Sequence, residues 1–237
     1  MRLAGRPTAA VLGIALFVLV AIEPAASQPP PSASAPPPAP RLAGGPLLDA
    51  LRSGGNVIYF RHAATVAEQA DTGDPLLNQC ETQRNLSAEG RRMAKEIGAA
   101  IKTLGVRVGR VVTSPYCRTR ETAELAFGRH ERSNALYFAV GVDREGRAAQ
   151  RAQLLRLLST APEAGTNVVL VSHNANLKEA TGIWPKREGD AHVFRPRPDG
   201  SHEYLGEILF EQWGRWLQDS VVGTGPATGV ERIPQGR

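Results

Sequence analysis

The stretch NVIYFRHAATV, residues 56–66, decides the fold that we predict for this chain. Its residues 57–60 are all β-branched or aromatic, which is typical of a buried strand in a sheet covered on both faces. Arg61 and His62 follow at once, at the point where the strand should leave the core. A single polar pair of this kind proves little, so the question is whether the pattern recurs.

The same pattern occurs twice more along the chain. Val111 and Val112 predict a short strand followed by the polar stretch SPYCRTR, and residues 168–171 predict a buried strand that ends at His173. Helical patterns lie at residues 87–104, 118–127 and 147–159. Alternating strands and helices predict an α/β domain with a largely parallel sheet. Because ligands bind beyond the carboxyl ends of such strands, the three polar stretches are expected to line one pocket.

The C-terminal part of the domain has a weaker pattern. Residues 187–202 are mostly polar and are expected to form a loop or an edge strand, whereas residues 204–210 predict a late strand. Trp213, Trp216 and Leu217 predict a short closing segment with one apolar face.

The first 27 residues have the features of a secretory signal peptide. Arg2 and Arg6 precede an apolar run at residues 9–22, and small residues follow at 25–27. The alternative is an uncleaved membrane anchor, but the run is shorter than the roughly 20 residues that a spanning helix needs. We therefore expect a secreted or periplasmic protein with no stable membrane span after signal cleavage.

The rest of the chain divides into three parts. Residues 28–46 are rich in Pro and Ala and predict an extended linker. Residues 47–220 have a size suited to one domain with one core, and residues 221–237 predict a flexible tail. None of these features specifies an oligomeric state, which stays open.

The charge composition favours a small anionic ligand over nucleic acid. The chain has 28 Lys and Arg against 23 Asp and Glu, a net charge of +5. The arginines are scattered, without a lysine-rich block or interleaved aromatic residues, so we expect no nucleic-acid partner. An anionic small substrate fits the basic balance.

Cys80 and Cys117 are the two cysteines of the sequence. In an oxidising compartment they can form a disulfide, and the alternative is two partly buried free thiols. We favour the disulfide because both residues lie in segments expected to face the same pocket.

Two histidines and two arginines in one pocket indicate phosphoryl transfer. A neutral imidazole is a competent nucleophile toward phosphorus and splits a difficult displacement into two easier steps. The guanidinium group of arginine matches phosphate oxygens and stays charged. Because the transferred group carries spread negative charge, the main requirement is a set of positive donors held in place.

Four ordered motifs resemble those of the histidine phosphatase superfamily, in its phosphoglycerate-mutase-like branch 1. They are RHAAT at 61–65, NLSAEG at 85–90, SPYCRTRETA at 114–123 and VSHN at 171–174. Each motif is weak alone, but the set occurs in the order of that family. The resemblance implies a three-layer α/β/α sandwich with a mostly parallel central sheet, phosphoglycerate-mutase-like in type.

The resemblance also implies roles for individual residues. His62 is then the nucleophile that becomes phosphohistidine, and His173 donates to the phosphoryl oxygens. Arg61 and Arg118 bind the phosphoryl group. Further candidate contacts to the substrate are Thr65, Arg84, Asn85 and Asn174. The implied activity is hydrolysis of phosphate monoesters, with a small phosphorylated molecule as substrate.

The motifs leave the general acid open. Ala63 replaces the usual glycine of the first motif, a change of one methyl group, and His173 is followed by Asn174 rather than aspartate. In the mutase-like branch the acid is a glutamate before the last strand, where Glu145 is the first candidate here and Asp143 the second. Without such an acid, the substrate needs a leaving group that departs easily, such as that of a phosphoramidate.

Other interpretations concern cofactors, other histidines and other functions. No Asp, Glu or Cys cluster with ligand spacing accompanies the two site histidines, so we expect no metal and no cofactor. His130, His192 and His202 are interpreted as structural, and Ser114 lacks the Gly-x-Ser-x-Gly setting of a nucleophile. The alternative functions are a phosphoglycerate-mutase-like phosphotransferase, an enzyme resembling envelope phosphatases that trim lipopolysaccharide sugars, and a non-catalytic phosphate-binding module.

Overall fold

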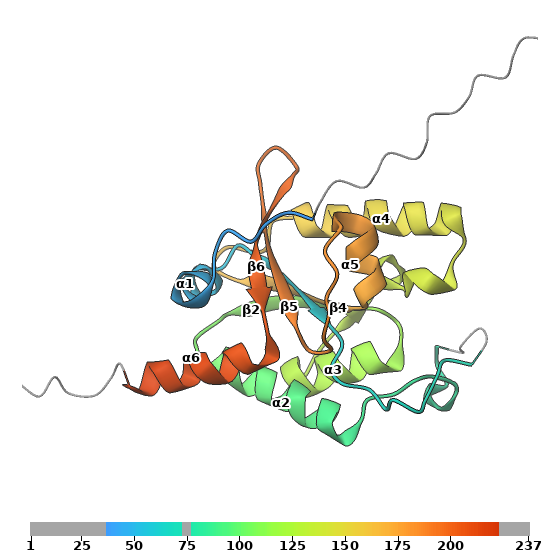
Figure 1. Ribbon diagram of the computed structural model, residues 1–237. Helices are drawn as coiled ribbons and strands as arrows, with labels where there is room; N and C mark the ends of the chain where they lie inside the picture. The colour runs from blue at the N-terminus through green and yellow to red at the C-terminus, as the bar shows by residue number, and fades with distance from the viewer. Residues whose placement is uncertain (1–36, 73–76, 223–237) are drawn as a thin grey trace, which may run out of the picture. The chain divides into compact units, whose positions relative to one another are not determined.

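The structure is a computed structural model that describes residues 37–72 and 77–222 (Figure 1). The predicted signal peptide, most of the predicted linker and the residues after 222 lie outside these ranges. None of the described helices has the length and apolar character needed to cross a membrane.

A six-stranded sheet runs through the domain in the order β3-β2-β4-β1-β5-β6. Its strands are β1 (Val57–Arg61), β2 (Val108–Thr113), β3 (Glu131–Arg132), β4 (Asn167–Ser172), β5 (Ala191–Pro196) and β6 (His202–Ile208). β1 and β2 pair with β4 in parallel, β3 pairs with β2 in parallel, and β5 and β6 are antiparallel additions beside β1. The predicted α/β fold with a mostly parallel sheet is confirmed. Because β2, β4 and β1 are neighbours, their carboxyl ends meet at one edge.

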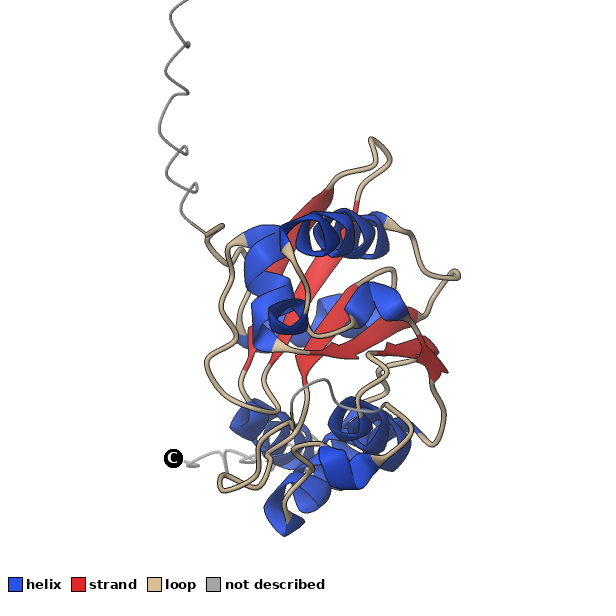
Figure 2. Ribbon diagram, turned by 90° about the vertical axis from the view of Figure 1, so that its right-hand side faces the viewer, coloured by secondary structure: helices blue, strands red, loops and turns tan. Residues whose placement is uncertain are grey.

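Helices cover both faces of this sheet and give the domain three layers (Figure 1, Figure 2). One face packs against α1 (Gly44–Ser53), α2 (Ala88–Thr103), α3 (Cys117–Phe127) and α6 (Phe210–Val222), and the other against α4 (Arg144–Ser159) and α5 (Asn174–Thr181). In β1, Ile58 and Phe60 join the first core, whereas Val57 and Tyr59 join the second. Successive side chains of a strand point to opposite faces, so cover on both faces explains the unbroken apolar run of β1.

The start of α2 lies against the segment that follows β1. Ser87 caps the helix, as predicted, and its hydroxyl accepts a hydrogen bond from the Gly90 nitrogen at 3.0 Å. Gly90 is required here because a Cβ atom at this position would overlap the backbone oxygen of Ala64. The close approach holds the residues after His62 in place.

Two expectations about the C-terminal part are wrong. Residues 187–202 are neither a loop nor an edge strand, because they contain β5, which lies between β1 and β6. The dipeptide Asp199-Gly200 lies in the turn that joins β5 to β6, with Gly200 at a φ of 80°. The expected strand at 204–210 ends early, because Phe210 begins α6.

The ordered contacts begin before residue 47. Helix α1 starts at Gly44, inside the predicted linker at 28–46. Arg41 forms an ion pair with Glu203 of β6 at 2.9 Å. The end of the linker therefore packs on the domain instead of standing away from it.

Candidate active site

The structure brings the two predicted site histidines together at the carboxyl edge of the sheet. His62 follows β1 and His173 follows β4, and these strands pair in parallel with Arg61 opposite Ser172. The two imidazole rings have centroids 5.6 Å apart and an interplanar angle of 67°. Arg118, at the start of α3, has its Nη2 atom 3.5 Å from Nδ1 of His173. Side chains from three separate strand ends thus meet in one place.

His62 is held as a neutral imidazole with one free nitrogen. Its side chain is buried, at 6% exposure, and its Nδ1 atom lies 2.9 Å from the backbone oxygen of Ala63. A carbonyl oxygen can only accept, so Nδ1 carries the proton and Nε2 keeps its lone pair. Burial, and then the positive charge of Arg118, hold the pKa of His62 well below its usual value. These features leave Nε2 available as a nucleophile.

His173 is fixed more tightly than His62. It is the N-cap residue of α5, is 1% exposed, and its backbone oxygen accepts a hydrogen bond from the Tyr59 hydroxyl at 2.7 Å. Its Nε2 atom lies 2.9 Å from Oγ of Ser114, and its Nδ1 atom faces Arg118. Burial and the charge of Arg118 lower the pKa of His173 strongly. Ser114 therefore orients this ring, in line with its rejection as a nucleophile.

Arg118 is a buried guanidinium group, at 3% exposure, with most of its donors already engaged. It donates to both carboxylate oxygens of Asp71, at 2.9 and 3.2 Å, and to the backbone oxygen of Arg84 at 3.3 Å. The ring of Tyr116 lies 4.5 Å from its central carbon. A two-oxygen pairing of this kind fixes the plane of the guanidinium group.

Arg61 is anchored by the segment that follows α5. Its Nη1 atom donates to the backbone oxygens of Pro185 and Lys186, at 3.2 and 2.8 Å, and its Nη2 atom lies 3.4 Å from Glu188. Its Nε atom is buried and, within the described residues, has no hydrogen-bond partner. Burial lowers the pKa of Arg61. An oxyanion bound between the two histidines would offer such a donor an acceptor.

Two carboxylates of the site were missed by the sequence analysis. Asp71 holds Arg118 and also accepts from the backbone nitrogen of Arg84 at 3.0 Å. Glu188 accepts from the backbone nitrogen and the hydroxyl of Thr65, at 3.0 and 2.8 Å. Neither residue lies in one of the four motifs, and only the folded chain places them beside the arginines.

The other predicted substrate contacts divide into two groups. Thr65 and Arg84 lie in the site, because both side chains contact Glu188, at 2.8 and 3.6 Å. Asn85 instead donates to the backbone oxygen of Cys80 at 2.6 Å. Asn174 accepts from the backbone nitrogen of the next residue in α5 at 2.8 Å. Both asparagine side chains are used to hold local backbone, and their role as substrate contacts stays a prediction.

The candidates for the general acid lie at the start of α4. Asp143 caps this helix by accepting from the Gly146 nitrogen at 2.8 Å, which explains why the helix begins at Arg144 and not at the predicted residue 147. Glu145 is exposed in the first turn. The hydrogen bonds and ion pairs of the described residues connect neither carboxylate with the site histidines. Their assignment as the acid stays a prediction.

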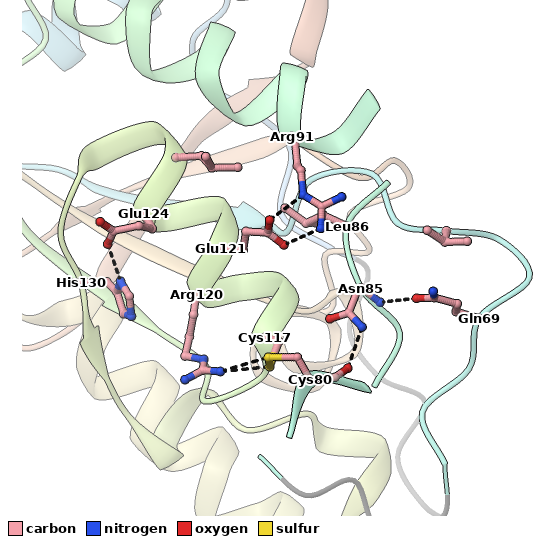
Figure 3. Close-up of a pocket in the computed structure, with 12 residues that line it drawn as sticks. Gln69, Cys80, Asn85, Leu86, Arg91, Cys117, Arg120, Glu121, Glu124 and His130 are labelled. Atoms are coloured by element: carbon pink, nitrogen blue, oxygen red, sulfur yellow. Dashed lines mark hydrogen bonds and ion pairs between the residues drawn. A yellow bond between two sulfur atoms is a disulfide. The ribbon is translucent and has the colours of Figure 1, made fainter. Parts of the chain in front are cut away.

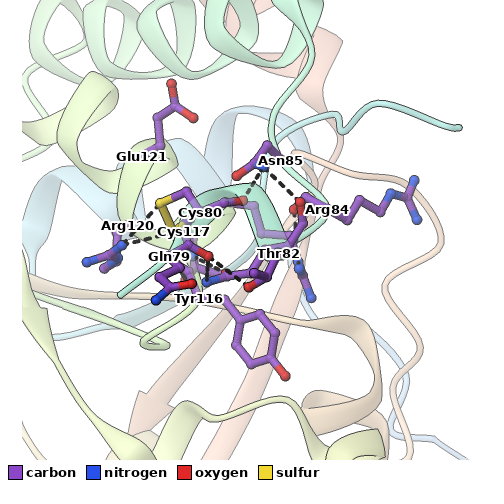
Figure 4. The surroundings of a disulfide bond; sticks show 12 residues. Gln79, Cys80, Thr82, Arg84, Asn85, Tyr116, Cys117, Arg120 and Glu121 are labelled. Carbon is purple, nitrogen blue, oxygen red and sulfur yellow. Dashed lines mark hydrogen bonds between the residues drawn. A yellow bond between two sulfur atoms is a disulfide. The ribbon is translucent and has the colours of Figure 1, made fainter. Parts of the chain in front are cut away.

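A disulfide joins Cys80 to Cys117, as favoured from the sequence (Figure 4). Cys117 is the first residue of α3 and directly precedes Arg118, so the bond ties the segment before α2 to the helix that carries the site arginine. Arg120, interpreted from the sequence as a surface residue, has its Nη2 atom 2.9 Å from the Cys117 sulfur. The disulfide thus belongs to the framework of the site.

A groove of about 700 Å³ lies on the far side of this disulfide (Figure 3). Its polar walls include the ion pair of Arg91 with Glu121, at 2.6 Å, and that of His130 with Glu124, at 3.4 Å. Neither site histidine lines the groove. The groove is therefore a separate feature, and His130 has the structural partner expected of it.

The remaining histidines lie in the sheet. Nδ1 of His192 in β5 is 3.1 Å from the Tyr204 hydroxyl, and Nδ1 of His202 in β6 is 3.1 Å from the Ser159 hydroxyl. Over residues 37–72 and 77–222, no group of three or more His, Cys, Asp or Glu side chains is arranged to hold a metal ion.

Comparison with known families identifies the segment that carries most of the site. Residues 57–137 match the family model of the histidine phosphatase superfamily (branch 1). The resemblance predicted from the ordered motifs is confirmed, because the match contains three of the four. The fourth motif, with His173, follows the matched segment and is joined to it by the fold. Among curated proteins, no sequence matches this chain.

Solved structures with a similar outline include several phosphatases. The protein histidine phosphatase SixA, solved with tungstate, is 16% identical over 65% of this chain and 97% of its own, with a TM-score of 0.44. A phosphoserine phosphatase variant from Entamoeba histolytica, solved with phosphoserine, is 14% identical over 66% and 98%, with a TM-score of 0.46. The protein TTHB049 from Thermus thermophilus is 18% identical over 65% and 98%, with a TM-score of 0.43. No residue role is taken from these chains.

Proposed function

We propose that this protein is a secreted or periplasmic phosphatase that hydrolyses phosphate monoesters or phosphoramidates through a covalent phosphohistidine on His62. One observation carries the proposal. A buried, neutral His62 with a free Nε2 atom lies beside His173 and Arg118. A nucleophile, a second imidazole and a fixed positive charge are what phosphoryl transfer to nitrogen requires.

The first step is attack on the substrate phosphorus. The lone pair of His62 Nε2 forms the N–P bond while the P–O or P–N bond of the substrate breaks, and the bonding electrons leave with the substrate atom. Arg61 and Arg118 offset the negative charge of the transferred group. The leaving atom takes its proton from water or from an acid that is still to be assigned.

The second step restores the enzyme. A water molecule attacks the phosphorus, the N–P bond breaks, and its electrons return to Nε2 of His62. The proton lost by the water passes to solvent with the released phosphate. His173 and the arginines hold the same oxygens in both steps, because the phosphoryl group stays in place while its two partners exchange.

Binding of the substrate has to change the partners of Arg118. Asp71 already takes both of its terminal nitrogens, and Arg84 and His173 lie on the remaining positions. A phosphoryl group that reaches these nitrogens therefore shares them with Asp71 or displaces it. An exchange of carboxylate for phosphate favours a doubly charged phosphomonoester over singly charged anions.

Two features support export. The apolar run of the predicted signal peptide is one, although these residues lie outside the described ranges. The Cys80–Cys117 disulfide is the other, because disulfides persist in oxidising compartments.

Trapping of the intermediate tests the function. The full-length chain, expressed in a bacterium with an outer membrane and recovered from its periplasm, is expected to release phosphate from members of a panel of esters, sugar phosphates, nucleotides and phosphoramidates. Quenching during turnover is expected to trap phosphate that is labile in acid and stable in base. His62→Ala is expected to lower kcat by at least about 10⁴-fold and to trap none, whereas the control His130→Ala is expected to behave as wild type.

Three results would count against the proposal. They are a base-labile phosphoenzyme, near-normal turnover by His62→Ala, and formation of an isomer in place of free phosphate. Phosphate binding without turnover across the whole panel would indicate a binding module.

A further inference from the structure

Glu188 places a carboxylate next to the proposed nucleophile, and no motif of the sequence pointed to it. The residue lies between α5 and β5, and its side chain is 17% exposed. The backbone nitrogen of Gly189 donates to the oxygen of His62 at 2.9 Å, which fixes the main chain beside the site. Thr65 fixes the carboxylate itself, through its nitrogen and its hydroxyl. Glu188 is therefore a built part of the site.

The position of this carboxylate is defined by the positive groups around it. Its Oε1 atom lies 3.4 Å from Arg61, 3.6 Å from Arg84 and 3.9 Å from Nδ1 of His62. The Nδ1 proton is directed to the Ala63 oxygen at 2.9 Å, so the contact with Glu188 is an electrostatic one. Glu188 thus acts on the charge of the ring without changing which nitrogen carries the proton.

Phosphorylation changes the charge of His62. The ring is neutral before attack, and when Nε2 bonds to phosphorus while Nδ1 keeps its proton, the ring becomes positive. Arg118, Arg61 and Arg84 all disfavour a positive ring at this position. A negative group near Nδ1 is needed to offset them.

We propose that Glu188 is a positioning residue that stabilises the positive charge His62 gains during phosphoryl transfer. The inference rests on the proposed function and assigns this carboxylate a role in the first step. The N–P bond forms at Nε2 and the substrate bond breaks on the opposite side of phosphorus. Glu188 faces Nδ1, at the rear of the attacking ring, so it is placed to act on the ring and not on the leaving group.

The variant Glu188→Gln tests this role by removing the charge while keeping the size of the side chain. With p-nitrophenyl phosphate and rapid quench, the rate of phosphoenzyme formation is expected to fall by about 10²-fold. The Kd of inorganic phosphate, measured by calorimetry, is expected not to rise, because a negative group has left an anion site. The control Glu131→Gln removes an exposed carboxylate that pairs with Arg110 at 2.9 Å outside the site, and is expected to change neither quantity.

The choice of ester separates a positioning residue from a leaving-group acid. The nitrophenolate departs without a proton, so loss of an acid would slow β-glycerophosphate far more than p-nitrophenyl phosphate. We expect equal defects with both esters. A defect confined to β-glycerophosphate, a raised Kd for phosphate, or an unchanged rate would each overturn the inference.

Two further outcomes are separable from these. Should Glu188→Gln fail to fold, Glu188→Asp carries the test, because it keeps the charge and moves it about 1.5 Å from the ring. A severalfold slower phosphorylation with unchanged phosphate binding is then expected, and a wild-type rate contradicts the role. A wild-type enzyme that forms no phosphoenzyme contradicts the proposed function itself, whereas equal rates in wild type and Glu188→Gln contradict only the Glu188 inference.

Discussion

His62 and His192 are both buried histidines on neighbouring strands, yet only His62 lies in the candidate active site. The two side chains are 6% and 2% exposed. Burial lowers the pKa of both, to about 4 for His192 and well below the usual value for His62. A buried imidazole with a low pKa is therefore not by itself a sign of catalysis.

The difference lies in the groups around each ring. His62 has the charge of Arg118 as the second cause of its low pKa, whereas burial is the cause for His192. The ring of His192 meets the Tyr204 hydroxyl, and its Nε2 atom lies 3.8 Å from Glu207. Burial makes each imidazole neutral, but the arginines turn one of the two places into an anion site.

The backbone differs as well. His192 sits within β5, between β1 and β6, and is paired opposite Tyr59 and Glu207. His62 follows the end of β1, and the described residues from there to α2 form no regular strand or helix apart from the short 3-10 turn Cys80–Thr82. The site region therefore depends on side-chain contacts and on the disulfide for its geometry.

Removal of the disulfide is expected to have the largest effect on stability. The bond closes a loop with a sequence separation of 37, and its loss in a Cys80→Ser, Cys117→Ser double variant should cost about 4 kcal/mol through the greater freedom of the unfolded chain. Urea unfolding of both forms measures the difference. A loss below about 1 kcal/mol would show that the segment before α2 is held by its other contacts.

Replacement of Arg118 is expected to have the next largest effect, on catalysis. Arg118→Lys keeps the charge but cannot bind both Asp71 oxygens in one plane. We expect kcat/KM for the best ester to fall by about 10²-fold. Arg120→Lys, two residues on in the same helix, is the matched control and should retain activity. Equal losses in the two variants would mean that α3, and not the guanidinium group of Arg118, determines the rate.

The strand ends could be predicted from the sequence because their signals are local. Unbroken apolar runs before Arg61 and His173 predict buried parallel strands, and parallel neighbours bring their carboxyl ends together. The Ser87 cap and the approach of Gly90 are equally local. The order of four motifs then predicted the superfamily that residues 57–137 match.

The carboxylates of the site could not be predicted in this way. Asp71 and Glu188 are distant in sequence from the residues they contact, Arg118 and Thr65, and a single acidic residue in a polar segment has no distinctive pattern. The position of β5 was missed for a related reason. Its antiparallel pairing depends on the Asp199-Gly200 turn, a recognisable hairpin signal that the polar residues around it obscure.

Acid unfolding of a His192→Asn variant gives the smallest predicted effect and separates burial from catalysis. The pKa of His192 is about 4 when folded and about 6.5 when unfolded, so between these values the unfolded chain binds one more proton than the folded one. Its contribution to stability is therefore lost as pH falls from about 6.5 toward 4, at about 1.4 kcal/mol per pH unit. The variant should lower the slope of stability against pH by this amount in that window, while kcat/KM at pH 7 stays within about twofold of wild type. An unchanged slope would mean that water reaches His192 in the folded protein, and a large loss of activity would make the contrast with His62 one of degree.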